Sequence, residues 1–164
     1  VLVLGKPLGN GFPLGAVITT RKIAESFAQG PEFFSTFGGS TVAMAAGNAV
    51  LDVIEQEGLA DNARAIGDHL LAGLRELQSR HELIGDVRGR GLFLGVELVQ
   101  DRDGKQPASR CASHVKNTLR ERRVLIGTDG PHDNVLKIRP PMTFDRAAAD
   151  HLLAQLDRAI AQTQ

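Results

Sequence analysis

The first part of the chain alternates between short apolar runs and stretches of turn-forming residues. Residues 1–4 are all apolar, which predicts a buried β-strand, and residues 15–19 predict a second short strand. The segment 5–13 between them holds three glycines and two prolines and is typical of a loop. A helical pattern follows over residues 20–29, with the apolar residues gathered on one side.

The next two helical patterns differ in how their apolar residues are spread. Behind a glycine-rich loop at 34–39, Ser40 has a side chain suited to cap a helix. The apolar residues after it surround nearly the whole circumference up to Leu51, so we expect a buried helix that ends at Gly58. Residues 59–79 instead place apolar positions three or four apart opposite a charged face, which predicts an amphipathic helix.

The C-terminal part mixes short strands with helices. The expected elements are a strand or pair of strands over 87–98, a helix over 108–122, a short strand over 124–126, a loop over 127–134, a strand over 135–138, and a helix from Thr143 or Asp145 to about 162. The composition changes near residues 57–60. We therefore expect residues 1–57 to end a large α/β domain and residues 58–164 to form a linking helix and a small α+β domain. Because the chain opens on an apolar strand without a methionine, we also expect these residues to be part of a longer protein.

Composition narrows the classes of function. Lys and Arg together number 19, as do Asp and Glu, so the net charge is zero and a nucleic-acid partner is disfavoured. The single cysteine, Cys111, excludes an internal disulfide framework and favours a reducing compartment, so we expect a cytoplasmic protein. No apolar run approaches the length of a membrane span, and the five histidines lack the spacing of metal ligands.

Two features of the first loop suggest chemistry. Residues 9–15 resemble a dinucleotide fingerprint, but three residues precede the last glycine and a strand follows, which argues against a Rossmann site. Lys6 directly follows the strand that we expect to be buried, where a lysine is costly unless it is paired or modified. Desolvation would make its amine a nucleophile suited to a Schiff base with an aldehyde cofactor. The alternative is a surface lysine whose stem lies along apolar residues.

Three motifs together resemble the class III aminotransferases. They are the sequence GKPLGNGFP at 5–13, FSTFGG at 34–39 and VRGRGL at 87–92, in the order and with the spacing of that family along essentially the whole chain. The resemblance implies an α/β protein, the C-terminal portion of a fold type I enzyme that uses pyridoxal 5'-phosphate (PLP). It also implies a small-molecule amine as substrate, and a homodimer whose active sites lie at the subunit interface.

The resemblance assigns roles to individual residues. Lys6 matches the lysine that binds PLP covalently. Thr36 matches the threonine that reaches across the dimer to the cofactor phosphate of the partner subunit, unless it is a simple loop residue. Residues 40–41 are Ser-Thr where the family commonly has Asn-Pro, which we interpret as a changed helix cap. Arg88 and Arg90 lie in a segment that is mostly structural in the family.

The segment 127–142 bears on the reaction, because it is similar to the phospho-lyases of the family, which act on phosphoethanolamine or phosphohydroxylysine. Many transaminases of α-amino acids place an arginine where Lys137 falls, and that arginine forms a bidentate pair with the substrate carboxylate. Lysine offers a point charge instead, so Lys137 fits a substrate without an α-carboxylate. Two alternatives remain. If the alignment with the family is shifted by two residues, Arg139 takes the position of the carboxylate-binding arginine; otherwise Lys137 is only a surface charge. Asp129 and His132 could form an acid–base pair, although such residues more often cap a turn.

Three functions remain open at this point. The first is a PLP-dependent phospho-lyase, and the second is a PLP-dependent aminotransferase for an ω-amine or an alanine/glyoxylate-type pair. The third is a fragment without catalytic activity or a dimerisation module. The third arises because the family places the aspartate that pairs with the pyridine nitrogen, and most phosphate-binding residues, upstream of the lysine. No metal, nucleic acid or membrane enters any of the three.

Overall fold

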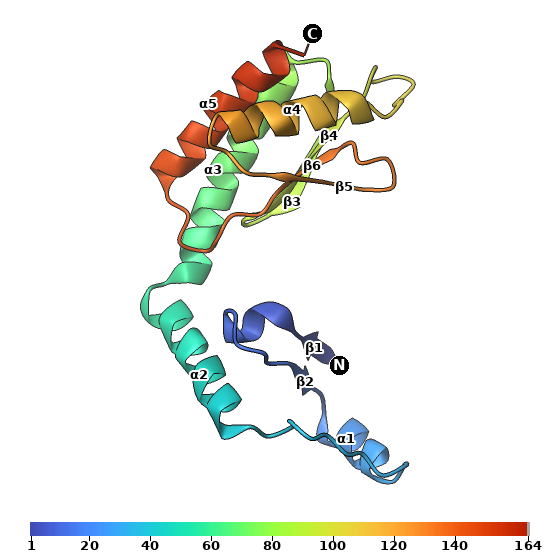
Figure 1. Ribbon diagram of the computed structural model, residues 1–164, viewed down its shortest axis with the longest axis vertical. Coiled ribbons are helices and arrows are strands. Elements are labelled where there is room, and N and C mark those ends of the chain that lie inside the picture. Colours follow the sequence, from blue (N-terminus) through green and yellow to red (C-terminus); the bar gives the residue numbers. More distant parts are fainter. Residues whose placement is uncertain (164) are drawn as a thin grey trace. The chain divides into compact units, whose positions relative to one another are not determined.

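A computed structural model describes residues 1–163 and divides the chain into two compact units, Val1–Gly58 and a second that begins at Leu59 (Figure 1). Within the described residues, no helix is both long enough and apolar enough to cross a membrane.

The N-terminal unit contains two short strands and three helical segments. They are β1 (Leu2–Leu4), the 3-10 helix η1 (Lys6–Gly9), β2 (Ala16–Ile18), α1 (Arg21–Ala28) and α2 (Thr41–Gln56). The two strands pair antiparallel, with Leu2 opposite Ile18, and α2 packs against η1. The expected cap of α2 is confirmed, because the Ser40 hydroxyl accepts a hydrogen bond from the Ala43 amide at 3.4 Å. Gly58 follows α2 with a φ of +61°, as expected for a residue after the last turn.

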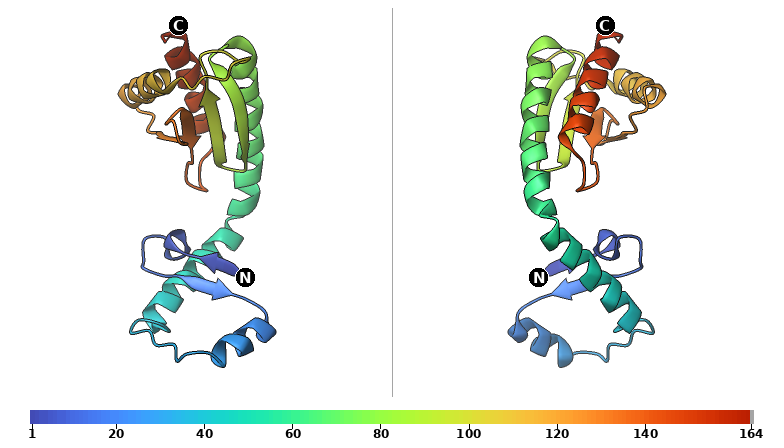
Figure 2. Two further views of the ribbon diagram at one scale, coloured as in Figure 1. Left: turned by 90° about the vertical axis from the view of Figure 1, so that its right-hand side faces the viewer. Right: turned by 90° about the vertical axis from the view of Figure 1, so that its left-hand side faces the viewer.

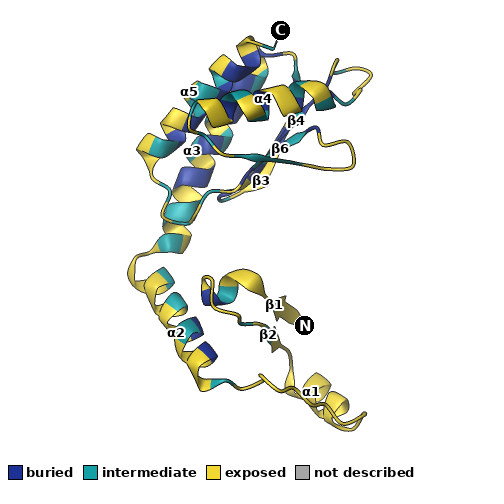
Figure 3. Ribbon diagram, in the orientation of Figure 1, coloured by how far each residue is buried: buried dark blue, intermediate teal, exposed yellow. Residues whose placement is uncertain are grey.

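Two predictions of burial in this unit are wrong for the described residues. β1 is exposed, with Val3 at 72% of its full accessibility, and α2 buries only Ala43 and Gly47 (Figure 3). The reason is the number of neighbours: β1 pairs with one strand only, and α2 contacts η1 on one side. The apolar side chains that point elsewhere lack a partner within residues 1–58. Exposed apolar surface of this extent is typical of an interaction surface.

The C-terminal unit is a four-stranded antiparallel sheet with helices on one face. Its elements are α3 (Leu59–Arg80), β3 (Ile84–Arg90), β4 (Phe93–Leu98), α4 (Ser109–Glu121), β5 (Gly127–Asp129), β6 (Val135–Ile138) and α5 (Arg146–Ala161). The strand order is β3-β4-β6-β5. Helices α3 and α4 lie against the sheet, and α5 packs against these two helices (Figures 1 and 2). The core between these layers includes Leu70, Leu74, Val96, Leu136 and Leu156, all fully buried.

The prediction of a strand over residues 124–126 is wrong. Val124 and Ile126 pack against the core from an irregular segment, and β5 begins at Gly127, directly after it. Gly127 pairs with Lys137 and Asp129 pairs with Val135, so hydrogen bonding to β6 decides where the strand lies. An apolar run alone does not distinguish a strand from a core-packing loop.

Helix α3 packs so closely on the turn between β3 and β4 that residue 67 has no room for a side chain. A Cβ on Gly67 would lie less than 3.0 Å from the backbone of Gly91. We expect Gly67→Ala to destabilise the protein by about 1–3 kcal/mol through overpacking, although alanine favours an isolated helix by about 1 kcal/mol. Chemical denaturation measures the change. Gly73→Ala is the matched control, since the three atoms nearest its Cβ would all belong to the side chain of Leu153, which can rotate. Equal losses in both variants would contradict the prediction.

Asp157 of α5 joins two residues at the end of α3 and just beyond it. The His81 ring lies 2.6 Å from one carboxylate oxygen, and the Arg80 guanidinium donates to the other at 3.1 Å. The hydrogen bond from His81, followed by the one from Arg80, lowers the pKa of Asp157, while burial opposes this change. His81 itself is buried. The folded protein therefore holds Asp157 in its ionised form.

The lowered pKa of Asp157 predicts a loss of stability in acid. A carboxyl group whose pKa is lower in the folded state stabilises the fold above its unfolded value, about 3.9 for aspartate. That contribution is lost as the pH falls through the folded-state pKa. Asp157→Asn should therefore weaken the protein at pH 7 and lose less further stability between pH 5 and pH 3 than the wild type. Urea midpoints at each pH measure this, with Asp103→Asn in an exposed loop as the control. If Asp157→Asn lost as much stability as the wild type between pH 5 and pH 3, the lowered pKa of Asp157 would be refuted as the cause.

Candidate active site

Lys6 lies where β1 ends and η1 begins. Its φ is +32°, in the left-handed region that is unfavourable for residues with a side chain. The position where a Cβ would stand on the neighbouring Gly5 faces open space, with no atom within 4 Å. Lys6 is exposed and forms no salt bridge with any residue of 1–163. The site thus combines an accessible amine with a strained backbone, as is common at functional positions.

The expected burial of Lys6 is wrong for the described residues. Because β1 is exposed, the strand does not desolvate the lysine that follows it. What holds Lys6 in place is the backbone of the loop. The Leu8 amide donates to the Gly5 carbonyl at 3.2 Å, and the Asn10 amide donates to the Pro7 carbonyl at 3.0 Å. These bonds close the turns on both sides of the lysine.

Thr36 lies in the loop that joins α1 to α2. The loop is ordered by the Gly38 amide, which donates to the Ser35 hydroxyl at 3.0 Å, and by an edge-to-face contact of Phe27 and Phe33 with ring centroids 5.8 Å apart. In every view this loop and η1 lie at opposite ends of the N-terminal unit (Figures 1 and 2). Within one chain η1 and this loop are therefore apart, and the role of Thr36 at a partner subunit's cofactor stays a prediction.

These two residues fit the groups that PLP needs from them. Lys6 offers a primary amine for the cofactor aldehyde, and Thr36 offers an exposed hydroxyl for a phosphate oxygen. Space is open beside Lys6, because no atom lies within 4 Å of the Cβ position on Gly5. Gly39 has a φ of +76°, which lets the backbone of this loop turn closely.

The sheet of the C-terminal unit has one face without helices, which we call the open face. Along β4, residues 94, 96 and 98 are buried under the helices, so Gly95 and Glu97 point to the open face. Cross-strand pairing places Arg88 opposite Gly95 and Gly95 opposite Lys137. Lys137 in turn pairs with Gly127 of β5. Two cationic side chains therefore stand in one row, and glycines lie beside them.

Both cations of this row have acidic partners. Arg88 donates to Asp86 at 2.5 Å and to Glu97 at 2.6 Å, and these hydrogen bonds raise the pKa of its guanidinium. The Lys137 ammonium donates to Asp129 at 2.8 Å. This bond, followed by one from the Gly130 amide, lowers the pKa of Asp129. Lys137 is therefore half of a neutral pair, and Arg88 fits the structural role expected of its segment.

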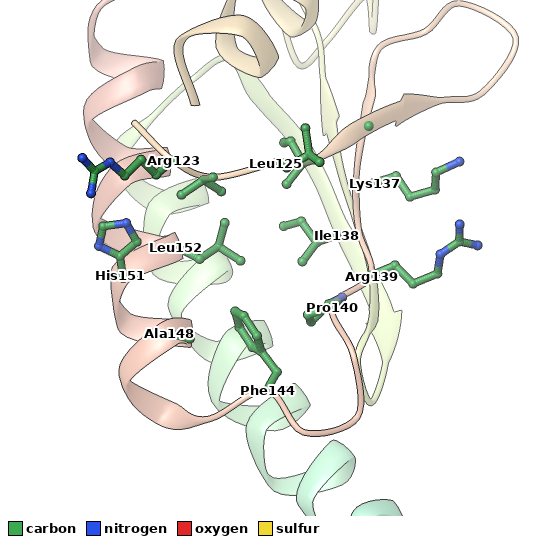
Figure 4. Close-up of a pocket in the computed structure, with 13 residues that line it drawn as sticks. Arg123, Leu125, Lys137, Ile138, Arg139, Pro140, Phe144, Ala148, His151 and Leu152 are labelled. Carbon is green, nitrogen blue, oxygen red and sulfur yellow. The ribbon is translucent and has the colours of Figure 1, made fainter. Parts of the chain in front are cut away.

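Lys137 borders two hollows. The larger, of about 610 Å³, has apolar walls that include Ile138, Phe144 and Leu152. In Figure 4, Arg123 and His151 point away from this cavity on one side, and Lys137 and Arg139 point away together on the other. The smaller hollow, of about 270 Å³, lies on the open face and is lined in part by Phe93, Gly95 and Lys137. The cations therefore frame an apolar space without converging inside it.

The structure does not form the acid–base pair of Asp129 and His132. The side-chain partners of Asp129 are Lys137 and the Gly130 amide. His132 contributes its backbone carbonyl, which accepts a hydrogen bond from the Ser109 hydroxyl. Among residues 1–163, no group of three histidine, cysteine, aspartate or glutamate side chains could hold a metal ion.

Comparison with known proteins supplies the family. A family model described as Aminotransferase class-III matches residues 1–160. The chain belongs to the class III aminotransferase family. Members of this family are in general PLP-dependent.

Individual relatives differ in the activities that their names state. The chain is 49% identical over 155 residues to alanine–glyoxylate aminotransferase 2-like of Drosophila melanogaster, covering 93% of this chain and 31% of the relative. It is 40% identical over 161 residues to ethanolamine-phosphate phospho-lyase homolog 1 of Caenorhabditis elegans, covering 98% and 34%. The chain thus spans about a third of the length of the curated relatives it matches.

Solved structures support the fold. A phospholyase from Arthrobacter in complex with phosphoethanolamine matches with a TM-score of 0.92 and 43% identity, over 97% of this chain and 38% of that one. A transaminase from the marine bacterium Virgibacillus matches with a TM-score of 0.89 and 30% identity, over 98% and 38%. The expected family and the expected α/β fold, the C-terminal portion of a PLP-dependent aminotransferase, are confirmed.

Sequence reasoning missed the partners of the cations on the open face. The contact of Lys137 with Asp129 joins residues eight apart, and that of Arg88 with Glu97 joins residues nine apart. Alternation within each strand could have placed the two cations on one face. Only the register between the strands could have shown which acids meet them.

The left-handed backbone at Lys6 predicts a conflict between stability and function. Lys6→Gly should stabilise the protein without cofactor by about 1 kcal/mol relative to Lys6→Ala, because glycine adopts a positive φ without strain. Thermal unfolding of the two variants measures the difference. Both lack the amine, so the comparison isolates the backbone. Equal stability, or a more stable alanine variant, would show that the strain is absent.

Proposed function

We propose that the full-length protein is a PLP-dependent phospho-lyase, which eliminates phosphate from a phosphorylated amino alcohol such as phosphoethanolamine. The observation that carries this proposal is the pairing of Lys137 with Asp129 at 2.8 Å. Lys137 stands where the resemblance puts the carboxylate-binding arginine of many α-amino-acid transaminases. The Lys137 ammonium lacks the planar pair of N–H donors with which a guanidinium binds a carboxylate, and Asp129 compensates its charge.

This pairing bears on the choice of substrate. An α-carboxylate that approached Lys137 would meet the negative charge of Asp129 beside it, which disfavours binding. Phosphoethanolamine carries no α-carboxylate, so pairing of Lys137 with Asp129 does not weaken the binding of this substrate. The likeness to the Arthrobacter phospholyase, at 43% identity, supports the same class of substrate.

The roles of the chain's own residues follow from the chemistry of the cofactor. PLP, when bound, supplies an electron sink for the substrate carbon that bears nitrogen. We assign Lys6 to hold the cofactor covalently until the substrate amine takes its place. The freed Lys6 amine then accepts the proton from that carbon. The electron pair of the broken C–H bond forms a double bond to the neighbouring carbon as phosphate leaves, and the released enamine takes up water to yield an aldehyde and ammonia.

We also propose that the protein acts as a homodimer. The loop that holds Thr36 lies at the other end of the N-terminal unit from η1 (Figures 1 and 2), and we propose that the Thr36 hydroxyl serves the cofactor phosphate of a partner subunit. The exposed phenylalanines beside it, Phe34 and Phe37, supply apolar area for such an interface. With a single cysteine in these 164 residues, we keep the cytoplasm as the expected compartment.

Transamination of an ω-amine or of an alanine/glyoxylate-type pair is the second candidate. It is favoured by the 49% identity to alanine–glyoxylate aminotransferase 2-like. The two activities share Lys6 and PLP and differ in what becomes of the substrate carbon after proton removal. A readout without a keto-acid acceptor therefore separates them.

The test is to incubate the full-length protein with PLP and phosphoethanolamine, without any keto acid, and to follow inorganic phosphate. We expect steady release that falls by at least about a thousandfold in Lys6→Ala, because the amine both holds the cofactor and moves the proton. Lys22→Ala, at an exposed lysine of α1, is the matched control. If no phosphate appears, and a second incubation supplied with alanine and glyoxylate consumes both, the protein is a transaminase and the lyase proposal fails.

A further inference from the structure

Hydrogen bonds within the loop that carries Lys6 fix the shape of this loop. Strands β1 and β2 pair at its base, where Leu4 lies opposite Ala16. Within the loop, the Phe12 amide donates to the Gly9 carbonyl at 2.9 Å, in addition to the two turns around Lys6. None of these bonds joins the loop to α2, so the place of the loop against this helix depends on side-chain packing.

The side chain of Leu14 packs the loop onto α2. Gly47 is buried in this helix, and a Cβ at this position would lie 2.5 Å from the Cδ2 atom of Leu14. Two non-bonded carbon atoms make their best contact at roughly 3.5–4.0 Å. Leu14 therefore occupies the space that a side chain at position 47 would take.

Leu14 also lies against the end of η1. Gly9, the last residue of η1, is buried, and a Cβ at this position would lie 3.2 Å from the Cβ of Leu14. Helix α2 packs against η1 as well. Leu14 thus lies between η1, which begins at Lys6, and Gly47 of α2.

This contact matters for Lys6 because the backbone of the lysine is strained. Its φ of +32° is unfavourable for a residue with a side chain, and such a conformation persists only where the surrounding structure holds it. Glycine is unfavourable inside a helix compared with alanine, yet α2 has a glycine at the position that Leu14 contacts. What this glycine provides is room for the loop to pack closely on the helix.

We propose that Leu14 and Gly47 are positioning residues for the cofactor lysine. Leu14 packs against α2 at Gly47 and so holds the turn of Lys6 where its amine meets the cofactor aldehyde. A side chain at position 47 would either push the loop away from α2 or turn Leu14 out of its place. This inference rests on the proposed role of Lys6 and adds to it the contact that fixes where the amine stands.

The experiment measures how readily Lys6 takes up PLP in the full-length protein. Protein freed of cofactor is mixed with limiting PLP and treated with sodium borohydride, which reduces the bond between lysine and PLP to a stable amine. Mass spectrometry then gives the modified fraction of Lys6. We expect the rate of modification to fall about tenfold or more in Leu14→Ala and in Gly47→Ala, since a misplacement of about 1 Å can cost roughly a hundredfold.

Two exposed positions of α2 provide matched controls. Leu51→Ala repeats the loss of a leucine side chain, and Asn48→Ala repeats the introduction of an alanine into the helix. Both should react at the wild-type rate. Thermal midpoints above the assay temperature show that each variant is folded, so slower modification then reports a displaced Lys6 amine.

A double variant distinguishes positioning from a general loss of stability. In Gly47→Ala combined with Leu14→Ala, the methyl group at position 47 enters space that the leucine has left. The rate should therefore recover to within about threefold of the wild type, whereas two independent changes would add and make the double variant the slowest of all. That second result would overturn the proposal, as would wild-type rates in both single variants.

The outcomes also separate this inference from the proposed function. If Lys6 is modified in the wild type but no phosphate is released from phosphoethanolamine, the lyase fails, and slower modification in Leu14→Ala still supports the positioning role. If the wild type carries no PLP on Lys6, the role of this lysine fails and the inference fails with it. Phosphate release with unchanged modification rates in the variants would leave the lyase intact and refute the positioning role alone.

Discussion

The antiparallel pairing of β6 with β4 and β5 fixes everything that the C-terminal unit presents on its open face. Because Lys137 lies opposite Gly95 on one side and Gly127 on the other, its long side chain stands between two positions without side chains. A shift of one residue would turn Lys137 into the core and bring Ile138 out, which the helices on the buried face forbid. The hydrophobic core therefore sets the register, and the contacts among the charged residues of the open face follow from it.

Charge compensation on that face then divides similar residues into different roles. Arg88 and Lys137 are both bonded to carboxylates, whereas Arg139, two positions from Lys137, contacts an aromatic ring instead of an acid. A count of basic residues would treat the three alike. Their positions relative to Asp129 and Glu97 decide which of them is hydrogen-bonded to an acid, and this is why the substrate proposal depends on a pairing rather than on a residue type.

The N-terminal unit differs from the C-terminal unit because few of its apolar side chains are packed against other residues of the unit. Its apolar strands and α2 leave large side chains exposed, while its loop holds Lys6 in an unfavourable backbone conformation. Strain of this kind persists only where surrounding hydrogen bonds fix it, and here the turns around Gly5 and Pro7 supply them. The exposed apolar side chains of this unit form a surface of the kind that binds other polypeptide.

The sequence by itself determined the family, the number and order of most elements, and the position of Lys6, because these depend on local patterns and on motifs of fixed spacing. It also predicted the caps at Ser40 and Gly58, which involve residues within one turn of the helix. Within residues 1–163, β1 and α2 are not buried as predicted, since burial depends on neighbours that a periodic pattern cannot supply. The place of β5 and the partner of Lys137 were decided only by the tertiary structure, because strand register is a property of two segments at once and neither segment encodes it alone.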